Sequence, residues 1–348
     1  MDDTAPIRPE ERFDERVVAS YLREHLGGLL GGGEIRFEQF PGGHANLTYL
    51  ARADDVELVL RRPPLGPIAP KSHDMIREHS VLSRISDAYP LAPRAYHLCL
   101  DEAVMGSPFF VMERRKGHVI RDHWPPELPD DPQVRGRVAA TFLQALIDLH
   151  LVDYPSIGLE ELGHPEGFVA RQVVGWTQRW EAAKTREVPA MDELARRLAG
   201  SVPSPQAGTL LHNDFKLDNV IVGPDGGLVA VFDWDMATIG DPLVDLATAL
   251  AYWSEPGDPD ERVFARTPLL EGGFPTRDEF AGTYAAGTGF DLSGLSWYES
   301  FAYFKVAVIV EQIFKRYAVG QTTDERFGAF GERTERLAAA GLDSTLQG

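Results

Sequence analysis

The spacing of apolar residues changes once along this chain of 348 residues, and that change constrains the fold more than any other feature. In the first third, the runs IRFEQF, NLTYLARA and VELVLRR alternate or are rich in β-forming residues, which is typical of strands. Farther on, apolar residues recur at helical spacing, as in VRGRVAATFLQALIDLHLV. A β-rich part followed by an α-rich part favours an α+β protein with two lobes.

Other segments complete both lobes. Residues 1–12 suggest a loose tail, and residues 12–30 predict a helix that ends in glycines. The three strands, broken by PGG and DD, predict an antiparallel meander. The remaining elements predicted for the first lobe are a helix over 72–89 and strands over 92–100 and 107–115. The second lobe is predicted to hold helices over 134–152, 165–184, 191–200 and from 243 onward. We therefore expect domains at 1–113 and 114–348.

Composition narrows the class of protein. The net charge of −19 disfavours nucleic acid as a partner, because phosphate backbones bind to positive surfaces. No run of about 18 apolar residues predicts a membrane span, and the acidic start predicts no secretory signal. The single cysteine, Cys99, lies in an apolar run and is expected to be buried. We expect a cytoplasmic protein without disulfides.

One polar segment, LLHNDFKLDN at 210–219, concentrates ionisable side chains between apolar flanks. Asp214 and Asn219 lie five residues apart, and Asp233 follows the apolar run VAVF. The GPDGG turn between two short strands is expected to bring Asn219 close to Asp233. Phosphoryl transfer needs a carboxylate for the hydroxyl proton, oxygen ligands for Mg²⁺ and a cation. Asp214, Asn219 and Asp233, with Lys216, match these needs.

These motifs resemble those of a known superfamily. HNDFKLDN is similar to the His-x-Asp-x-x-x-x-Asn catalytic loop of protein-kinase-like enzymes, and VFDWDMATIGDPLVDLA resembles the second signature of the aminoglycoside phosphotransferase family. The resemblance covers residues 30–320 and implies a two-lobed protein-kinase-like fold with an antiparallel sheet in the small lobe.

The resemblance also implies roles for single residues. Asp214 would be the catalytic base, Asn219 and Asp233 the Mg²⁺ ligands, and Lys216 would reach the γ-phosphate of ATP. The same likeness gives His212 a structural role. It implies that Asp241 and Asp245 tie the loop by hydrogen bonds to its backbone. For Asp241 the alternative is a cap on the helix that begins near Pro242.

A phosphate-binding loop is predicted in the first lobe. Gly42 and Gly43 in FPGGHANLTY allow backbone N–H groups to approach phosphates, although such a turn is often only a turn. Asn46 is expected to help shape this loop. In the resemblance, Arg61 takes the place of the lysine that grips the inner phosphates, and Glu78 is its acidic partner on the next helix. Arg61 rather than Arg62 is chosen because it shares a strand face with Val59.

The segment between the lobes is expected to bind the nucleotide base. By resemblance, the backbone of Met112, Glu113 and Arg114 would hold adenine, and GTP is an alternative to ATP. The run LRRPP also resembles the branch of phosphotransferases that is associated with acyl-CoA dehydrogenases.

The acceptor is the least constrained feature. The resemblance favours the hydroxyl group of a hydroxy acid or hydroxyacyl-CoA metabolite, with an aminoglycoside or a pseudokinase role as alternatives. The acidic loop 254–261 would suit a polycationic sugar, or it is simply solvated. The missing Ala-Pro-Glu-like segment disfavours a protein kinase. Six aromatic residues of the second lobe are expected to line its core rather than the site: Trp176, Trp180, Trp297, Tyr298, Tyr303 and Phe304.

Overall fold

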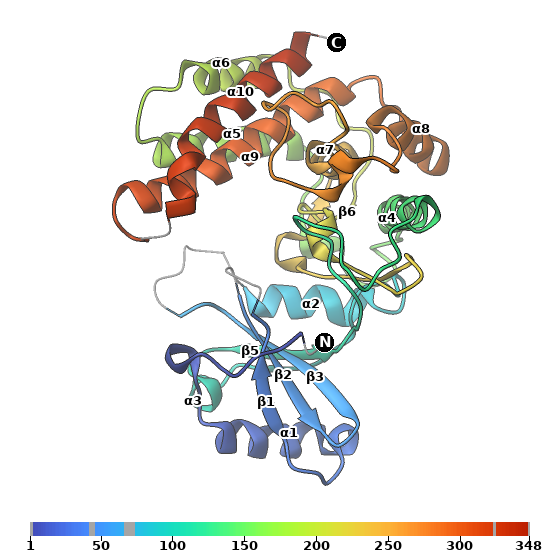
Figure 1. Ribbon diagram of the computed structural model, residues 1–348, viewed down its shortest axis with the longest axis vertical. Helices are drawn as coiled ribbons and strands as arrows, with labels where there is room; N and C mark the ends of the chain where they lie inside the picture. The colour runs from blue at the N-terminus through green and yellow to red at the C-terminus, as the bar shows by residue number, and fades with distance from the viewer. Residues whose placement is uncertain (1–2, 42–45, 66–73, 323–324, 347–348) are drawn as a thin grey trace. The chain divides into compact units, whose positions relative to one another are not determined.

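The computed structural model describes residues 3–41, 46–65, 74–322 and 325–346, and the chain forms two compact units (Figure 1). The sheet unit comprises Met1–Lys116, Ile157–Leu159 and Val229–Ala237. The helical unit comprises Gly117–Ser156, Glu160–Leu228 and Thr238–Gly348. The predicted α+β architecture, with an antiparallel sheet in one part and a mainly helical remainder, is confirmed.

The sheet unit contains a five-stranded antiparallel sheet in the order β1-β2-β3-β5-β4. Its strands are β1 (Arg36–Gln39), β2 (Leu47–Ala53), β3 (Val56–Arg62), β4 (Ala95–Cys99) and β5 (Phe109–Glu113). The predicted meander is β1-β2-β3, whereas β5 lies between β3 and β4. The register of β3 with β5 pairs Val59 with Met112 and Arg61 with Phe110.

Helices cover both faces of this sheet (Figure 1). These helices are α1 (Glu15–Leu30), α2 (Met75–Ile85) and α3 (Glu102–Met105). Val18 and Leu22 of α1 share one apolar cluster with Leu58 and Leu60 of β3. Side chains alternate along a strand, so Arg61 points to the other face, where α2 lies. The strand thus aims Arg61 at α2, because Leu58 and Leu60 at the alternating positions are buried on the side of α1.

The first residues of the chain do not form the loose tail that the sequence suggests. Ala5 exchanges two backbone hydrogen bonds with Gln39 at the end of β1, of 2.8 and 2.7 Å. Ile7 is buried, and a short 3₁₀ helix, η1, follows at Pro9–Glu11. The prediction is wrong because the segment is held by backbone hydrogen bonds to a strand edge, which carry no side-chain pattern.

The helical unit is built around the 24-residue helix α9 (Leu295–Ala318), which packs against α5, α6, α7 and α10. Its other long helices are α4 (Pro132–His150), α5 (Phe168–Ala183), α6 (Pro189–Gly200), α7 (Pro242–Tyr252), α8 (Arg277–Thr288) and α10 (Phe330–Leu346). Their ends carry ordinary caps: Asp131 caps α4 ahead of Pro132, and Thr276 forms a capping box with Glu279 at α8.

Short strands position the polar segment of the sequence. β6 (Thr209–Leu211) pairs antiparallel with β9 (Thr238–Gly240), with Leu210 opposite Ile239. The catalytic-loop segment leaves β6, and α7 begins directly after β9. Two further strands, β7 (Val220–Val222) and β8 (Leu228–Val231), flank the predicted turn. That turn is confirmed by a 2.8 Å hydrogen bond from Gly223 N–H to the Gly227 carbonyl.

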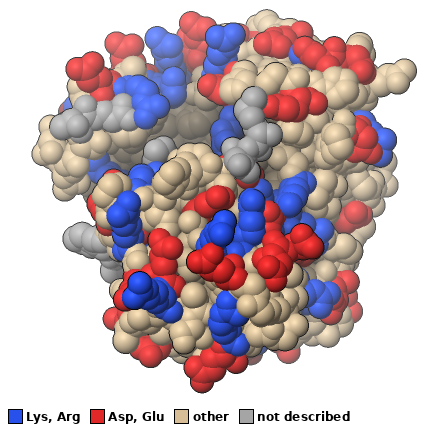
Figure 2. Space-filling view, turned by 60° about the horizontal axis from the view of Figure 1, so that its bottom comes forward, with Lys and Arg blue, Asp and Glu red and all other residues tan. Residues whose placement is uncertain are grey.

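Core and surface follow the expected division. Cys99 and all six aromatic residues assigned to the core of the second lobe are buried. None of the helices in the described part of the chain combines the length and apolar character needed to cross a bilayer. Acidic and basic side chains are intermixed on the face drawn in Figure 2. The negative net charge is therefore not gathered into a single acidic patch on that face.

Candidate active site

The loop at residues 212–219 is fixed to the helical unit by one buried carboxylate. Asp245, fully buried on α7, accepts hydrogen bonds from the backbone N–H groups of His212 and Asn213, each at 2.6 Å. It also lies 3.4 Å from Nε2 of His150, which is equally buried. The predicted tether from Asp245 to the loop backbone is therefore confirmed.

Asp241 directly precedes α7, and each of its carboxylate oxygens has a hydrogen-bond partner. Its Oδ1 accepts a 3.0 Å hydrogen bond from the backbone N–H of Leu243, so it is the N-cap of α7. Its Oδ2 accepts a 2.9 Å hydrogen bond from the hydroxyl of Tyr298 on α9. The alternative role as a helix cap is confirmed, and the predicted bond from Asp241 to the loop backbone stays a prediction. A residue directly before Pro242 is well placed to cap a helix because proline suits the first helical position.

Three candidate residues meet within the loop. Nζ of Lys216 lies 2.8 and 3.0 Å from the two carboxylate oxygens of Asp214. Nδ2 of Asn219 donates to Oδ2 and to the backbone carbonyl of Asp214, both at 2.8 Å. The side chain of Asp214 is 23% exposed, so its carboxylate is oriented by two donors and still reaches solvent. Such a carboxylate can accept a proton from an incoming hydroxyl group.

The cation of this group is held between acidic and aromatic neighbours. Burial lowers the pKa of Lys216, but Tyr252, Asp214 and Asp218 outweigh burial and raise it above its ordinary value. Lys216 Nζ also lies 5.1 Å from the ring centroid of Tyr252, close enough for a cation–π contact. Lys216 is therefore an ammonium group at neutral pH, and it can offset charge on a phosphoryl group.

His212 lies beneath the loop. Its ring is fully buried, packs edge-on against Phe215 at 5.8 Å, and its Nδ1 accepts a 3.3 Å hydrogen bond from the backbone N–H of Asp214. These contacts orient the loop and leave the ring away from solvent. They are consistent with the structural role implied by the resemblance.

Lys305 is a buried cation that the sequence reasoning missed. It lies on α9, is 4% exposed and donates a 2.5 Å hydrogen bond from Nζ to the carbonyl of Asn213. Asn213 has a φ of 66°, a left-handed conformation that is uncommon for residues other than glycine. Two buried side chains therefore fix Asn213 in its left-handed conformation. Lys305 donates a hydrogen bond to its carbonyl, and Asp245 accepts one from its N–H. The signal was present as a lone lysine within the apolar run SFAYFKVAVIV.

Replacing Lys305 with methionine is expected to lower kcat about tenfold, the effect of losing one charge-assisted hydrogen bond. The affinity for nucleotide should not change, because Lys305 contacts the loop backbone and the ring of Trp176 and none of the described residues assigned to the nucleotide. Lys315→Met is a matched control, since Lys315 lies on the same helix and donates to the Ala182 carbonyl at 2.7 Å. Steady-state kinetics measure both variants. A wild-type kcat in Lys305→Met as well as in Lys315→Met would show that Lys305 does not support catalysis.

A second group of candidate residues lies in the sheet unit. Nε of Arg61 on β3 lies 3.1 Å from Glu78 on α2, and Nη2 of Arg61 is bonded to Asp233. Asp233 directly precedes a short 3₁₀ helix, η4 (Trp234–Met236), and has a left-handed φ of 71°. The structure therefore gathers Arg61, Glu78 and Asp233, which are far apart in the sequence. A strained backbone at a carboxylate is common where a side chain must be aimed at a ligand.

Electrostatics in this group are dominated by burial. Burial raises the pKa of Glu78 above its usual range, and the guanidinium of Arg61 opposes that effect. Arg62, the alternative arginine, points to the opposite face and donates to the carbonyls of Glu11 and Met105 and to the hydroxyl of Tyr49. Of the two arginines, Arg61 is the one that lies beside carboxylates.

The other residues predicted to bind nucleotide lie before β2 and at the end of β5. Gly42 and Gly43 lie outside the described residues, and Asn46, directly after that gap, is buried. Met112 and Glu113 end β5, where the N–H of Glu113 donates to the Arg94 carbonyl at 2.8 Å.

Arg114 follows β5 and has two contacts of its own. Its guanidinium lies 4.8 Å from the ring centroid of Phe40 and pairs with Asp3. The predicted roles of all the nucleotide-binding residues remain predictions.

The donor set suits Mg²⁺. Among the described residues, no cluster of three or more His, Cys, Asp or Glu side chains could hold a metal ion. The predicted set, an amide oxygen from Asn219 and a carboxylate from Asp233, is of the kind that Mg²⁺ takes together with phosphates. The side-chain nitrogen of Asn219 donates both of its hydrogen bonds to Asp214. The amide oxygen takes no part in these two bonds. Asn219 belongs to the helical unit and Asp233 to the sheet unit, so their pairing stays a prediction.

An arginine at the start of α8 neutralises part of the negative charge of the acidic loop at 254–261. Arg277, at the start of α8, pairs with Asp258 and lies 3.5 Å from Glu255. These carboxylates are therefore occupied by an internal cation. A polycationic sugar would have to compete with Arg277 for them.

Comparison with known proteins adds the following findings. Residues 36–298 match the model of a family described as "Phosphotransferase enzyme family". Acyl-CoA dehydrogenase family member 10 of Mus musculus is 33% identical over 350 residues, which are 99% of this chain and 32% of that protein. The chain therefore spans about a third of that relative's length.

Solved structures show the same fold. One from Ralstonia eutropha JMP134, provisionally described as an aminoglycoside phosphotransferase, has a TM-score of 0.81 at 27% identity, covering 97% of this chain and 99% of that one. A thermostable mutant of aminoglycoside phosphotransferase APH(4)-Ia, in complex with AMP-PNP and hygromycin B, has a TM-score of 0.61 at 16% identity, covering 94% and 98%. These likenesses confirm the predicted two-lobed, protein-kinase-like fold.

Proposed function

Because this chain belongs to the phosphotransferase enzyme family, a small-molecule kinase-type group, we propose that it transfers the γ-phosphate of Mg·ATP to a hydroxyl group of a small molecule. The single observation that carries the proposal is the loop in which Lys216 and Asn219 orient Asp214 while Asp245 fixes the backbone. The bound AMP-PNP of the APH(4)-Ia complex supports ATP as the nucleotide, and GTP is an alternative.

The proposed chemistry assigns one task to each residue. The acceptor oxygen attacks the γ-phosphorus, the bond to ADP breaks, and the hydroxyl proton passes to the carboxylate of Asp214. Lys216 offsets charge on the moving phosphoryl group. Asn219 and Asp233 would hold Mg²⁺, which when bound neutralises charge on the phosphates. Most of the rate enhancement would come from positioning and charge compensation.

The sheet unit would bind the nucleotide. Arg61, oriented by Glu78, would contact the inner phosphates, and the Gly42–Gly43 segment and Asn46 would cover them. The backbone of Met112, Glu113 and Arg114 would hold the base. In this proposal residues 1–113 are the nucleotide-binding lobe and residues 114–348 carry the catalytic loop and the acceptor site.

The acceptor is proposed to be a hydroxy acid or a hydroxyacyl-CoA type of metabolite. The name of the mouse relative, an acyl-CoA dehydrogenase family member, supports this class. The pairing of Arg277 with Asp258 and Glu255 also favours it, because an aminoglycoside site needs free carboxylates. Aminoglycoside phosphorylation, or nucleotide binding without turnover, are the alternatives that a turnover assay with a mixed acceptor panel distinguishes. The cytoplasmic setting expected from the single cysteine is part of the same proposal.

The double variant Arg61→Met/Glu78→Gln is expected to weaken ATP binding by about ten- to a hundredfold, since charge-assisted contacts to phosphate are lost. Both residues are changed together because Arg61→Met alone would leave Glu78, which is 1% exposed, as an unpaired buried carboxylate. Titration calorimetry with Mg·ATP measures the effect. Arg52→Met on the neighbouring strand, where Arg52 pairs with Glu57 at 3.2 Å, is the control. Equal affinities in both variants would exclude Arg61 from phosphate binding.

A further inference from the structure

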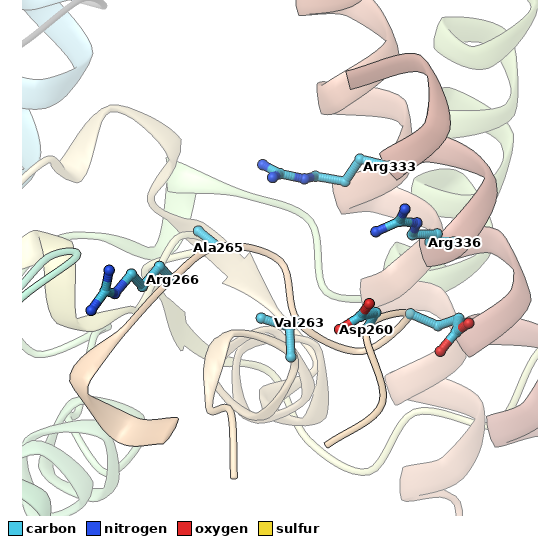
Figure 3. A pocket seen from close by; sticks show the side chains of 7 residues that line it. Asp260, Val263, Ala265, Arg266, Arg333 and Arg336 are labelled. Atoms are coloured by element: carbon cyan, nitrogen blue, oxygen red, sulfur yellow. The ribbon is translucent and has the colours of Figure 1, made fainter. Parts of the chain in front are cut away.

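A cavity of about 210 Å³ lies in the helical unit, between the loop around residues 260–266 and helix α10 (Figure 3). Three of its lining residues are arginines: Arg266 comes from the loop, and Arg333 and Arg336 extend from α10 toward it (Figure 3). None of these three is part of the proposed transfer chemistry. The protein has a net charge of −19, so three arginines in the lining of one cavity are unexpected.

Arg333 is held in place by aromatic rings rather than by a carboxylate. Its guanidinium carbon lies 5.1 Å from the ring centroid of Phe330 and 5.8 Å from that of Phe264. Within the part of the chain that the structure describes, Arg333 makes no ion pair. Contacts with ring faces leave the N–H donors at the edge of the guanidinium plane available for a ligand.

The lining of the cavity carries more basic than acidic side chains. Burial, followed by the neighbouring charge of Arg336, lowers the pKa of Arg333. Two acidic residues, Asp260 and Glu261, also line the cavity, but both are exposed. Over the described ranges neither of them lies within ion-pair distance of an arginine.

The other arginines of this region differ in their partners. Arg336 has one partner, the exposed Glu332 on the same helix, at 3.7 Å. Arg277, by contrast, is satisfied by two carboxylates of the same loop, Asp258 and Glu255. Arg277 is thus paired with two carboxylates, whereas Arg336 has one exposed partner at 3.7 Å and Arg333 makes no ion pair among the described residues.

A chain of aromatic contacts links the cavity to the catalytic loop. Lys216 lies 5.1 Å from the ring of Tyr252, the Tyr252 and Phe264 ring centroids are 5.1 Å apart, and Arg333 follows at 5.8 Å from Phe264. All four residues belong to the helical unit. Two aromatic rings, those of Tyr252 and Phe264, thus lie between Arg333 at the cavity and Lys216 in the catalytic loop.

We propose that this cavity binds a phosphate monoester or diphosphate group through Arg333 and Arg336. Guanidinium groups match phosphate oxygens with paired, charge-assisted hydrogen bonds, and several of them suit a group with more than one negative charge. The group has two sources: a phosphate at the far end of the acceptor, which rests on the proposed function, or a free anion that acts as an effector.

Binding is tested without turnover, by titration calorimetry of inorganic diphosphate in the absence of Mg²⁺ and nucleotide. Wild-type protein is expected to bind at one site, and Arg333→Ala or Arg336→Ala to weaken that binding at least about tenfold. Arg316→Ala removes an exposed arginine of α9 that makes no ion pair in the described part of the chain, and it should leave the binding unchanged. Arg333→Lys keeps the positive charge but loses the paired N–H donors of the guanidinium, so this variant should bind diphosphate with intermediate affinity.

Three results would overturn the proposal. The first is an affinity in the Arg333 and Arg336 variants equal to that of the wild type, and the second is no binding by the wild type. The third is loss of binding in Arg61→Met/Glu78→Gln, which would assign diphosphate to the nucleotide site instead. Thermal unfolding of each variant shows whether a loss of binding is only a loss of fold. Because no step needs phosphate transfer, failure of the proposed kinase activity would not affect this test.

Kinetics with two acceptors identify the source of the phosphate. A hydroxyacyl-CoA thioester carries phosphates and an adenosine group that the same acid on pantetheine lacks, and Arg333→Ala tests the share of the phosphates. If the acceptor supplies the group, Arg333→Ala raises KM for the CoA thioester about tenfold and leaves KM for the pantetheine thioester unchanged. If a free anion supplies it, neither KM changes, while diphosphate binding still depends on Arg333.

Discussion

Asp214→Asn is expected to lower kcat by about two to four orders of magnitude, which is the range for loss of a general base. The asparagine keeps the size of the side chain and can still accept hydrogen bonds from Lys216 and Asn219, so the loop should keep its conformation. The affinity for Mg·ATP should remain close to that of the wild type, because Asp214 is assigned to the acceptor and not to the nucleotide. Single-turnover rates and nucleotide titrations on the same preparation measure both quantities.

A neighbouring carboxylate provides the matched control for this variant. Asp218 lies in the same loop and neighbours Lys216, and burial raises its pKa. Asp218→Asn should cost far less activity than Asp214→Asn, since Asp218 has no assigned proton transfer. If the two variants were equally active, or if Asp214→Asn turned over like the wild type, Asp214 would not be the base.

The largest expected effect on stability is that of Asp245→Ala, which should lower the free energy of unfolding by about 3–5 kcal/mol. The substitution leaves the N–H groups of His212 and Asn213 without their acceptor in a fully buried place and removes the partner of His150. Each lost contact concerns a group that water cannot reach. Chemical denaturation monitored by tryptophan fluorescence measures the difference.

Asp245 should also contribute to the pH dependence of stability. Burial raises its pKa, but the hydrogen bond and charge of His150 and the bond from His212 outweigh burial, so the pKa lies below its usual value. A carboxyl group with a lower pKa in the folded state stabilises the protein above its unfolded pKa and loses that contribution as the pH falls through its folded pKa. The wild type should therefore lose stability below about pH 4, and Asp245→Asn should reduce that loss.

An exposed aspartate on a helix of the same unit serves as the reference. Asp148 lies on α4 and accepts a hydrogen bond from Gln144 at 2.7 Å. Asp148→Ala should change the free energy of unfolding by less than about 0.5 kcal/mol, as is usual for surface positions. Similar losses in Asp148→Ala and Asp245→Ala would mean that the buried tether contributes nothing beyond an ordinary side chain.

Most elements of the fold were predictable because their apolar residues repeat at short range. The strands β1 to β5 and the helices α1, α2, α4, α5 and α6 were all predicted from such patterns. The three-residue strands β6 and β9 were not, since three positions give no periodic pattern; β7 is equally short but was predicted because the GPDGG turn follows it. The pairing of Ala5 with Gln39 was missed for a related reason: backbone hydrogen bonds at a sheet edge leave no periodic signal.

The candidate site was predictable where it is local in sequence. Asp214, Lys216 and Asn219 lie within six positions, and the structure brings their side chains together. Lys305 is separated by 92 positions from Asn213, whose carbonyl it holds, so only the packing of α9 could show its role. In the same way, the 19 positions between Asp258 and Arg277 concealed the neutralisation of the acidic loop.

The measurement that tests the central claim most directly is Mg·ATP turnover by purified protein against hydroxy acids, hydroxyacyl-CoA thioesters, aminoglycosides, sugars and amino alcohols, with Asp214→Asn beside it. Phosphorylated product is identified by mass spectrometry. The account predicts phosphorylation of a hydroxy acid or hydroxyacyl-CoA acceptor that Asp214→Asn loses. Phosphorylation of aminoglycosides alone would contradict the proposed acceptor. Nucleotide binding without any product, or equal turnover by Asp214→Asn, would contradict the proposed reaction.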